Sequence, residues 1–141
     1  MQQLRYLLDT HIVIWWLSKS KNINKHIFED IKYFQYPFFV SVESLREIVT
    51  LITTDRIDLK MTLREIVAAL AEQQIEIVPI ELRHIEVLEQ LPIPNIGNEL
   101  HKDPADRLLI AQAIADNYTI ISADHKFPFY ERFGLNLLLN D

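Results

Sequence analysis

Two aspartates stand where short apolar strands are expected to end. Asp9 directly follows the apolar segment at residues 4–8, and Asp124 follows a second such segment, residues 118–121, by three residues. Acids in such places are common as turn residues and helix caps, so neither one alone indicates a site. If both strands belong to one parallel sheet, however, the two carboxylates meet at its carboxyl edge, where open α/β sheets bind their ligands.

Two further aspartates open a strongly apolar helix expected over residues 104–116. Asp103 has the residue type of an N-cap, and Pro104 suits the first helical position. Asp106 lies three residues past the cap, where an acid also favours the helix dipole. The segment behind it is apolar on nearly every face, which is typical of a buried helix. Because a carboxylate at the mouth of a buried helix requires a cation or amide partners, Asp106 is the stronger candidate of the two.

The helix expected over residues 42–53 adds two glutamates one turn apart. Its apolar stripe is predicted to consist of Val42, Leu45, Ile48, Val49 and Ile52. Glu43 and Glu47 both lie away from that stripe, where a solvated polar face is the ordinary interpretation. Periodicity alone does not choose between them as a functional acid.

Carboxylates that converge on one edge define the chemistry this chain could perform. Negative charges packed together repel one another, and a cation or a shared proton makes the arrangement tolerable. Oxygen-only ligands suit Mg²⁺ or Mn²⁺ better than zinc or copper. Such an ion polarises a phosphoryl oxygen, lowers the pKa of bound water and stabilises the leaving oxygen. We therefore expect phosphodiester hydrolysis that needs no nucleophilic side chain.

Short strands that alternate with helices are expected to position these acids. Strands are predicted at residues 4–8, 37–40, 75–80, 118–121 and 137–139. Helices are predicted at residues 11–19, 24–35, 42–53, 62–73, 81–91 and 104–116, and residues 92–102 read as a loop. Thr10 and Ser41 have the residue types of N-caps for the first and third helices. The alternation predicts an α/β domain with a mostly parallel sheet.

The composition limits the classes of protein to consider. A length of 141 residues fits one domain, expected over residues 1–141. The absence of cysteine excludes disulfides, thiolate zinc sites and a cysteine nucleophile, and it suits a reducing cytoplasm. The apolar run at residues 12–17 is far shorter than the about 20 residues of a membrane span, and no signal peptide is evident. We expect a cytoplasmic protein without a membrane segment.

The net charge of −6 argues against a general nucleic-acid coat, because such binding depends on basic side chains that neutralise phosphates. A metal bound among the acids would invert the local charge. Candidates for contacting phosphates around it are His11, His101, Lys102, Arg107, His125 and Lys126. Trp15 and Trp16 could serve the core, a partner groove or base stacking.

Four segments in order resemble the PIN-domain family, and specifically its VapC-type toxins. They are residues 7–11 running on to Trp15-Trp16, residues 41–48, residues 101–111 and residues 122–124. The second segment, Ser41-Val42-Glu43-Ser44-Leu45-Arg46-Glu47-Ile48, singles out Glu47 rather than Glu43. Arg46 stands where the family often has an aromatic and Ala105 where phenylalanine is common, and neither departure removes an acid.

The resemblance implies a three-layer α/β/α fold with a mostly parallel five-stranded sheet. It implies a Mg²⁺- or Mn²⁺-dependent endoribonuclease that acts as the toxin of a toxin–antitoxin pair. In that reading Asp9, Glu47 and Asp106 are the main metal ligands, and Asp124 supports the metal or the water. It also implies a homodimer, an RNA substrate and a small antitoxin protein that blocks the cleft.

Three other classes of protein compete with this interpretation. A catalytically silent PIN-like module would bind RNA or protein only, and the presence of all four acids argues against it. A phosphoacceptor receiver domain needs a lysine ending a later strand, where this chain has Ser122. A haloacid-dehalogenase-like phosphatase expects Asp-x-Asp after the first strand, where this chain has Asp9-Thr10-His11. Fold resemblance alone would support either of these last two classes only weakly.

Overall fold

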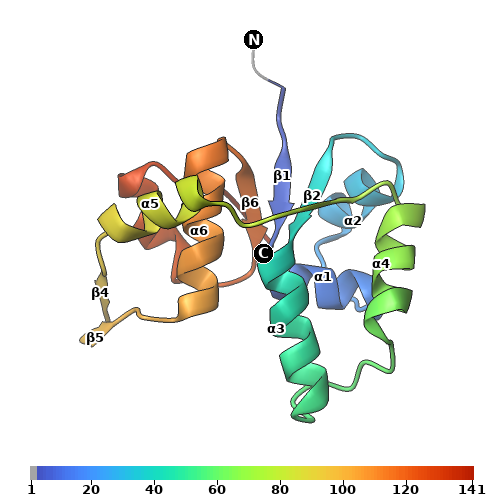
Figure 1. Ribbon diagram of the computed structural model, residues 1–141. Coiled ribbons are helices and arrows are strands. Elements are labelled where there is room, and N and C mark those ends of the chain that lie inside the picture. Colours follow the sequence, from blue (N-terminus) through green and yellow to red (C-terminus); the bar gives the residue numbers. More distant parts are fainter. Residues whose placement is uncertain (1–2) are drawn as a thin grey trace.

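The computed structural model describes residues 3–141, in which helices cover both faces of a parallel five-stranded sheet (Figure 1). Its strands are β1 (Tyr6–Leu8), β2 (Phe38–Ser41), β3 (Glu76–Val78), β6 (Thr119–Ser122) and β7 (Asn136–Leu139). They lie in the order β3-β2-β1-β6-β7, and each neighbouring pair is parallel. The predicted three-layer α/β/α fold with a five-stranded sheet is therefore confirmed.

The helices form one layer on each side of the sheet. They are α1 (Thr10–Leu17), α2 (Lys25–Lys32), α3 (Val42–Thr53), α4 (Leu63–Glu72), α5 (Leu82–Gln90), α6 (Pro104–Asp116) and the 3₁₀ helix η1 (Phe127–Phe133). In Figure 1, α1, α2 and α4 lie on one side of the central strands, and α5 and α6 lie on the other. Within residues 3–141, no helix is long and apolar enough to cross a bilayer.

The alternation of side chains along β1 explains why both layers are needed. Tyr6 and Leu8 belong to an apolar cluster that includes Ile12 of α1, whereas Leu7 packs with Leu109 of α6 on the opposite face. All three β1 side chains are buried. Strands covered on both faces are typical of parallel sheets, whose crossover helices pack on each side.

The segment predicted as a loop over residues 92–102 contains a small antiparallel hairpin, β4 (Asn95–Ile96) and β5 (Glu99–Leu100). Gly97 and Asn98 connect its strands with φ values of +59° and +69°. Positive φ at both central residues is the signature of a tight hairpin turn, and glycine and asparagine adopt it most easily. The hairpin carries the chain from α5 to the start of α6.

The buried face of α3 differs from the predicted stripe. Its buried residues are Glu43, Ser44, Leu45 and Ile48, while Val42 is 45% exposed. The helix contacts both α1 and α6. Its buried face is therefore rotated away from Val42 and toward the side that carries Glu43 and Glu47. The predicted N-cap is confirmed, because the Ser41 side chain accepts the Glu43 backbone N–H.

Candidate active site

A cleft of about 380 Å³ lies at the carboxyl edge of the sheet and gathers acids from distant parts of the chain. The acids that line it are Asp9, Glu47, Asp103, Asp106 and Asp124. Asp9 follows β1 and Asp124 follows β6, and these two strands pair in parallel with Leu8 opposite Ile121. Glu47 comes from the second turn of α3, and Asp103 and Asp106 come from the N-cap and the first turn of α6. All four predicted site residues therefore border one cavity.

Asp9 is the most firmly held of these acids. It is 6% exposed, and its Oδ1 accepts the Thr10 backbone N–H at 2.7 Å as the N-cap of α1. The predicted cap at Thr10 is thus wrong by one residue, because the aspartate that ends the strand also begins the helix. Burial raises the pKa of Asp9 to about 6, with a further increase from Glu47, while hydrogen bonds from Ser122 and Thr10 oppose the rise.

Ser122 joins the first and last acids of the cleft. Its hydroxyl donates to Asp9 Oδ2 at 2.7 Å, and its oxygen accepts the Asp124 backbone N–H at 3.0 Å. The Asp124 carboxylate in turn accepts the Lys126 backbone N–H at 2.9 Å, which fixes the loop after β6. The sequence segment containing Asp124 was singled out for its acid only, and the fully buried serine two positions earlier was missed.

Asp106 lies among the other acids at the start of α6. Its backbone N–H donates to Asp103 Oδ1 at 2.9 Å, so the prediction of Asp103 as the N-cap is confirmed. Burial raises the pKa of Asp106 to about 8, and repulsion from Asp9, Asp103, Asp124 and Glu47 adds to this effect. The carboxyl group is therefore close enough to all four acids for their charges to act on it.

The two glutamates of α3 have different surroundings. Glu43 is buried and accepts two hydrogen bonds from Arg46, at 2.6 and 2.9 Å, so its charge is already compensated. Glu47 is half-buried and borders the acid cleft, as well as a smaller neighbouring cavity of about 170 Å³. The tertiary structure thus brings Glu47, and not Glu43, to the other acids.

The chemistry of this donor set fits a hard divalent cation. Within residues 3–141, no three His, Asp or Glu side chains already stand where they could hold a metal ion between them. Burial raises the pKa of Asp106, however, and the negative charges of Asp9, Asp103, Asp124 and Glu47 raise it further. A cation would relieve that repulsion and allow the carboxylates to approach one another. All the candidate ligands are oxygens, which Mg²⁺ and Mn²⁺ prefer.

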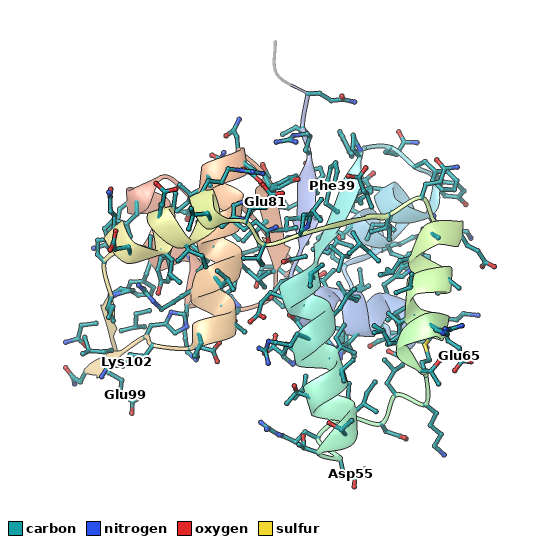
Figure 2. The ribbon with its side chains drawn as sticks, in the orientation of Figure 1. Phe39, Asp55, Glu65, Glu81, Glu99 and Lys102 are labelled. Atoms are coloured by element: carbon teal, nitrogen blue, oxygen red, sulfur yellow. The ribbon has the colours of Figure 1, made fainter. Side chains whose placement is uncertain are left out.

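The side chains predicted to contact phosphates fall into two groups. His11 and Lys126 line the cleft, together with Trp15, whose ring centroid is 6.3 Å from that of His11. His125 is exposed, and its Nε2 lies 3.8 Å from Asp141 Oδ1. Lys102 lies beside the β4/β5 hairpin, next to Glu99 (Figure 2). Neither His125 nor Lys102 lines the cleft.

The prediction that His101 and Arg107 contact substrate phosphates is wrong, because both side chains are buried. His101 is 7% exposed and Arg107 is 8% exposed. The guanidinium of Arg107 donates to the carbonyls of Leu91 and Pro92 at 2.8 and 2.9 Å. Both ring nitrogens of His101 also have protein partners. Sequence adjacency to an acid did not reveal that these side chains point inward.

The sequence matches one protein family, described as the PIN domain, over residues 6–132. A search of curated proteins found no match. Among solved structures, VapBC2 from Rickettsia felis, bound to a DNA fragment from its promoter, has a TM-score of 0.72 at 18% identity, covering 98% of this chain and 100% of that one.

Two further solved structures resemble this chain at similar coverage. DNA-bound VapBC from Salmonella typhimurium has a TM-score of 0.64 at 16% identity, covering 98% of this chain and 99% of that one. VapBC-1 from nontypeable Haemophilus influenzae has a TM-score of 0.63 at 14% identity, covering 96% and 97%. At these identities the likeness demonstrates a common fold.

Proposed function

This chain belongs to the PIN domain family, and from that premise we propose that it is a Mg²⁺- or Mn²⁺-dependent endoribonuclease acting as the toxin of a toxin–antitoxin pair. The observation that carries the proposal is the meeting of Asp9, Glu47, Asp106 and Asp124 around one cleft. These acids come from four separate segments between residues 9 and 124, so a role as separate turn residues or caps does not account for their convergence.

Asp9, Glu47 and Asp106 would hold the ion, with Asp124 supporting it or the attacking water. When bound, the ion supplies positive charge that polarises the phosphodiester and acidifies the water. Asp9 suits the role of a fixed ligand, because the Thr10 amide and the Ser122 hydroxyl each hold one of its oxygens. A ligand that is already held in place loses little freedom when the ion arrives.

The cleft also carries groups suited to a single-stranded nucleic acid. His11 and Lys126 border the acids and would contact the phosphates on either side of the scissile bond. Trp15 is half-buried at the same cleft and offers a face on which a base could stack. These contacts would offset the repulsion that a net charge of −6 exerts on RNA.

We further propose an antitoxin protein that covers the cleft, and a homodimer. Support for a protein partner comes from the solved structures with this fold, which are of VapBC assemblies. Support for self-association comes from α5, where Leu82 and Ile85 are 75% and 43% exposed. Exposed apolar side chains grouped on one helix are typical of interaction surfaces.

The test is cleavage of tRNA, rRNA and messenger RNA by purified, antitoxin-free protein with Mg²⁺ or Mn²⁺. We expect cleavage that is lost with EDTA and in Asp9→Asn. Asp55→Asn is the matched control, because Asp55 is exposed at the far end of α3 (Figure 2) and its φ of +55° is one that asparagine tolerates. Folded protein that cleaves none of these RNAs would favour a silent module that binds RNA or protein.

A further inference from the structure

A series of hydrogen bonds, buried except for its last member, leads from α6 back to one of the cleft acids. Arg107 Nη1 donates to Tyr130 Oη at 3.2 Å, and Tyr130 Oη lies 2.7 Å from His101 Nδ1. His101 Nε2 then lies 3.1 Å from Asp106 Oδ2. His101, Asp106 and Arg107 lie close together in sequence around the start of α6, and the fold brings Tyr130 of η1 to them.

Burial fixes the direction in which these hydrogen bonds run. Tyr130 is 0% exposed, so its hydroxyl proton needs a protein acceptor. Arg107 has only donors, which leaves His101 Nδ1 as the acceptor of the Tyr130 proton. A neutral histidine whose Nδ1 accepts carries its proton on Nε2. His101 therefore donates from Nε2 to Asp106 Oδ2.

Arg107 anchors the series at its other end. Its guanidinium also donates to the backbone carbonyls of Leu91 and Pro92, at 2.8 and 2.9 Å. These contacts hold the side chain against the end of α5 and the segment that follows it. Tyr130 and His101 are thereby linked to a side chain held by two backbone carbonyls, which restricts how the His101 ring can turn relative to Asp106.

We propose that His101, aligned by Tyr130 and Arg107, is a positioning residue that holds the Asp106 carboxylate by one oxygen and leaves the other for a divalent cation. The proposal rests on the proposed function, in which Asp106 is a cation ligand. The structure gives Asp106 Oδ1 no hydrogen-bond partner among residues 3–141. Without the donor at His101, the carboxylate could rotate and turn away from the other acids.

The first measurement is long-range ¹H–¹⁵N NMR of the histidine rings in cation-free protein, which reports the tautomer directly. We expect the Nε2–H form of His101, and a loss of that preference in Tyr130→Phe, which removes only the hydroxyl. A His101 ring protonated on Nδ1 alone in the wild-type protein would overturn the proposal, because it could not then donate to Asp106.

The second measurement is the Mn²⁺ dissociation constant without RNA, by EPR of free Mn²⁺ or by calorimetry. Loss of a residue that orients a metal ligand weakens affinity by about 10–100-fold, which is the effect expected for His101→Leu. His101→Gln keeps an N–H donor of similar reach and should restore most of the affinity. Tyr130→Phe should lie between the two.

His84→Leu is the matched control for the loss of a buried histidine. Like His101, His84 is buried and bonds a carboxylate, with its Nε2 2.7 Å from Asp116 Oδ2, but it lies outside the cleft. We expect this variant to lower the urea midpoint without changing Mn²⁺ affinity. Equal Mn²⁺ affinity in folded His101→Leu, His101→Gln and wild type would overturn the positioning role.

The same measurements separate this proposal from the proposed function. Wild-type protein that binds Mn²⁺ with the expected dependence on His101, yet cleaves no RNA, would support the positioning role and overturn the proposed nuclease function. Wild-type protein that binds no Mn²⁺ would overturn both.

Discussion

Ser122→Ala removes the hydroxyl that joins the first and last acids of the cleft, and we predict a large loss of stability for so small a change. Ser122 Oγ donates to the Asp9 carboxylate at 2.7 Å and accepts the Asp124 N–H at 3.0 Å. A hydrogen bond to a charged group contributes about 1.5–3 kcal/mol, and one between neutral groups about 0.5–1.5 kcal/mol. Together they give an expected loss of about 2–4.5 kcal/mol in the free energy of unfolding at neutral pH.

Ser44→Ala is the matched control for this prediction. Ser44 and Ser122 are both 0% exposed, but the Ser44 oxygen accepts from a neutral group, Thr10 Oγ1, at 3.1 Å. The expected loss is about 0.5–1.5 kcal/mol for that bond, reduced by the better helix propensity of alanine within α3. The two substitutions remove the same atom, so the difference between them reports the charge of the Asp9 partner together with the second hydrogen bond of Ser122, to Asp124, and the helix propensity at Ser44.

The assay is urea unfolding in EDTA, so that no cation compensates for the missing donor. A ¹³C NMR titration of the Asp9 carboxyl provides an independent reading. The Ser122 hydrogen bond lowers the pKa of Asp9 against the effect of burial, so its removal should raise that pKa above about 6. Equal losses for the two serine variants, or an Asp9 pKa that does not move, would refute the role assigned to Ser122.

Two further predictions concern the acids and the surface. In EDTA the wild-type protein should lose stability as pH rises from about 4 to 8, because the folded pKa of Asp106, about 8, exceeds its ordinary 3.8 and the fold favours the protonated carboxyl. Asp106→Asn should flatten this decline in a pH series of urea unfolding, and parallel curves would contradict the prediction. Leu82→Lys places a charge on the most exposed apolar side chain of α5 and should shift a homodimer toward monomer in light scattering, whereas an unchanged mass would exclude α5 as the interface.

The sequence was sufficient for the order and type of the main elements. The α3 helix was predicted with the bounds that the structure has, because Ser41 caps it and its first turn carries Glu43. The capping of α6 by Asp103 was predicted for the same reason. Such features depend on residues within one helical turn of one another, so a single sequence contains what determines them.

Contacts between residues distant in sequence explain the predictions that failed within single elements. Thr10 and Asp9 are both good N-cap residues, and the choice between them depends on where β1 ends. The neighbouring strand β6 holds the backbone at that point, because the Asp9 N–H donates to the Ile121 carbonyl at 3.0 Å. Val42 is apolar and in phase with the predicted stripe, yet it is 45% exposed because α3 packs between two neighbours. In both cases a partner distant in sequence decided the outcome.

The sequence by itself thus determined the fold class, the strand ends that carry Asp9 and Asp124, and the helix start that carries Asp106. Helical periodicity left Glu43 and Glu47 equivalent, and only the family resemblance singled out Glu47. The tertiary structure decided that Glu47 meets these acids while Glu43 pairs with Arg46, and that His101 turns inward toward Tyr130. The physical reason is that periodicity specifies which side of an element a residue occupies, but not which neighbour lies there. Hydrogen bonds between residues 113 positions apart, such as that from Ser122 to Asp9, form only when the packed sheet brings two strand ends together.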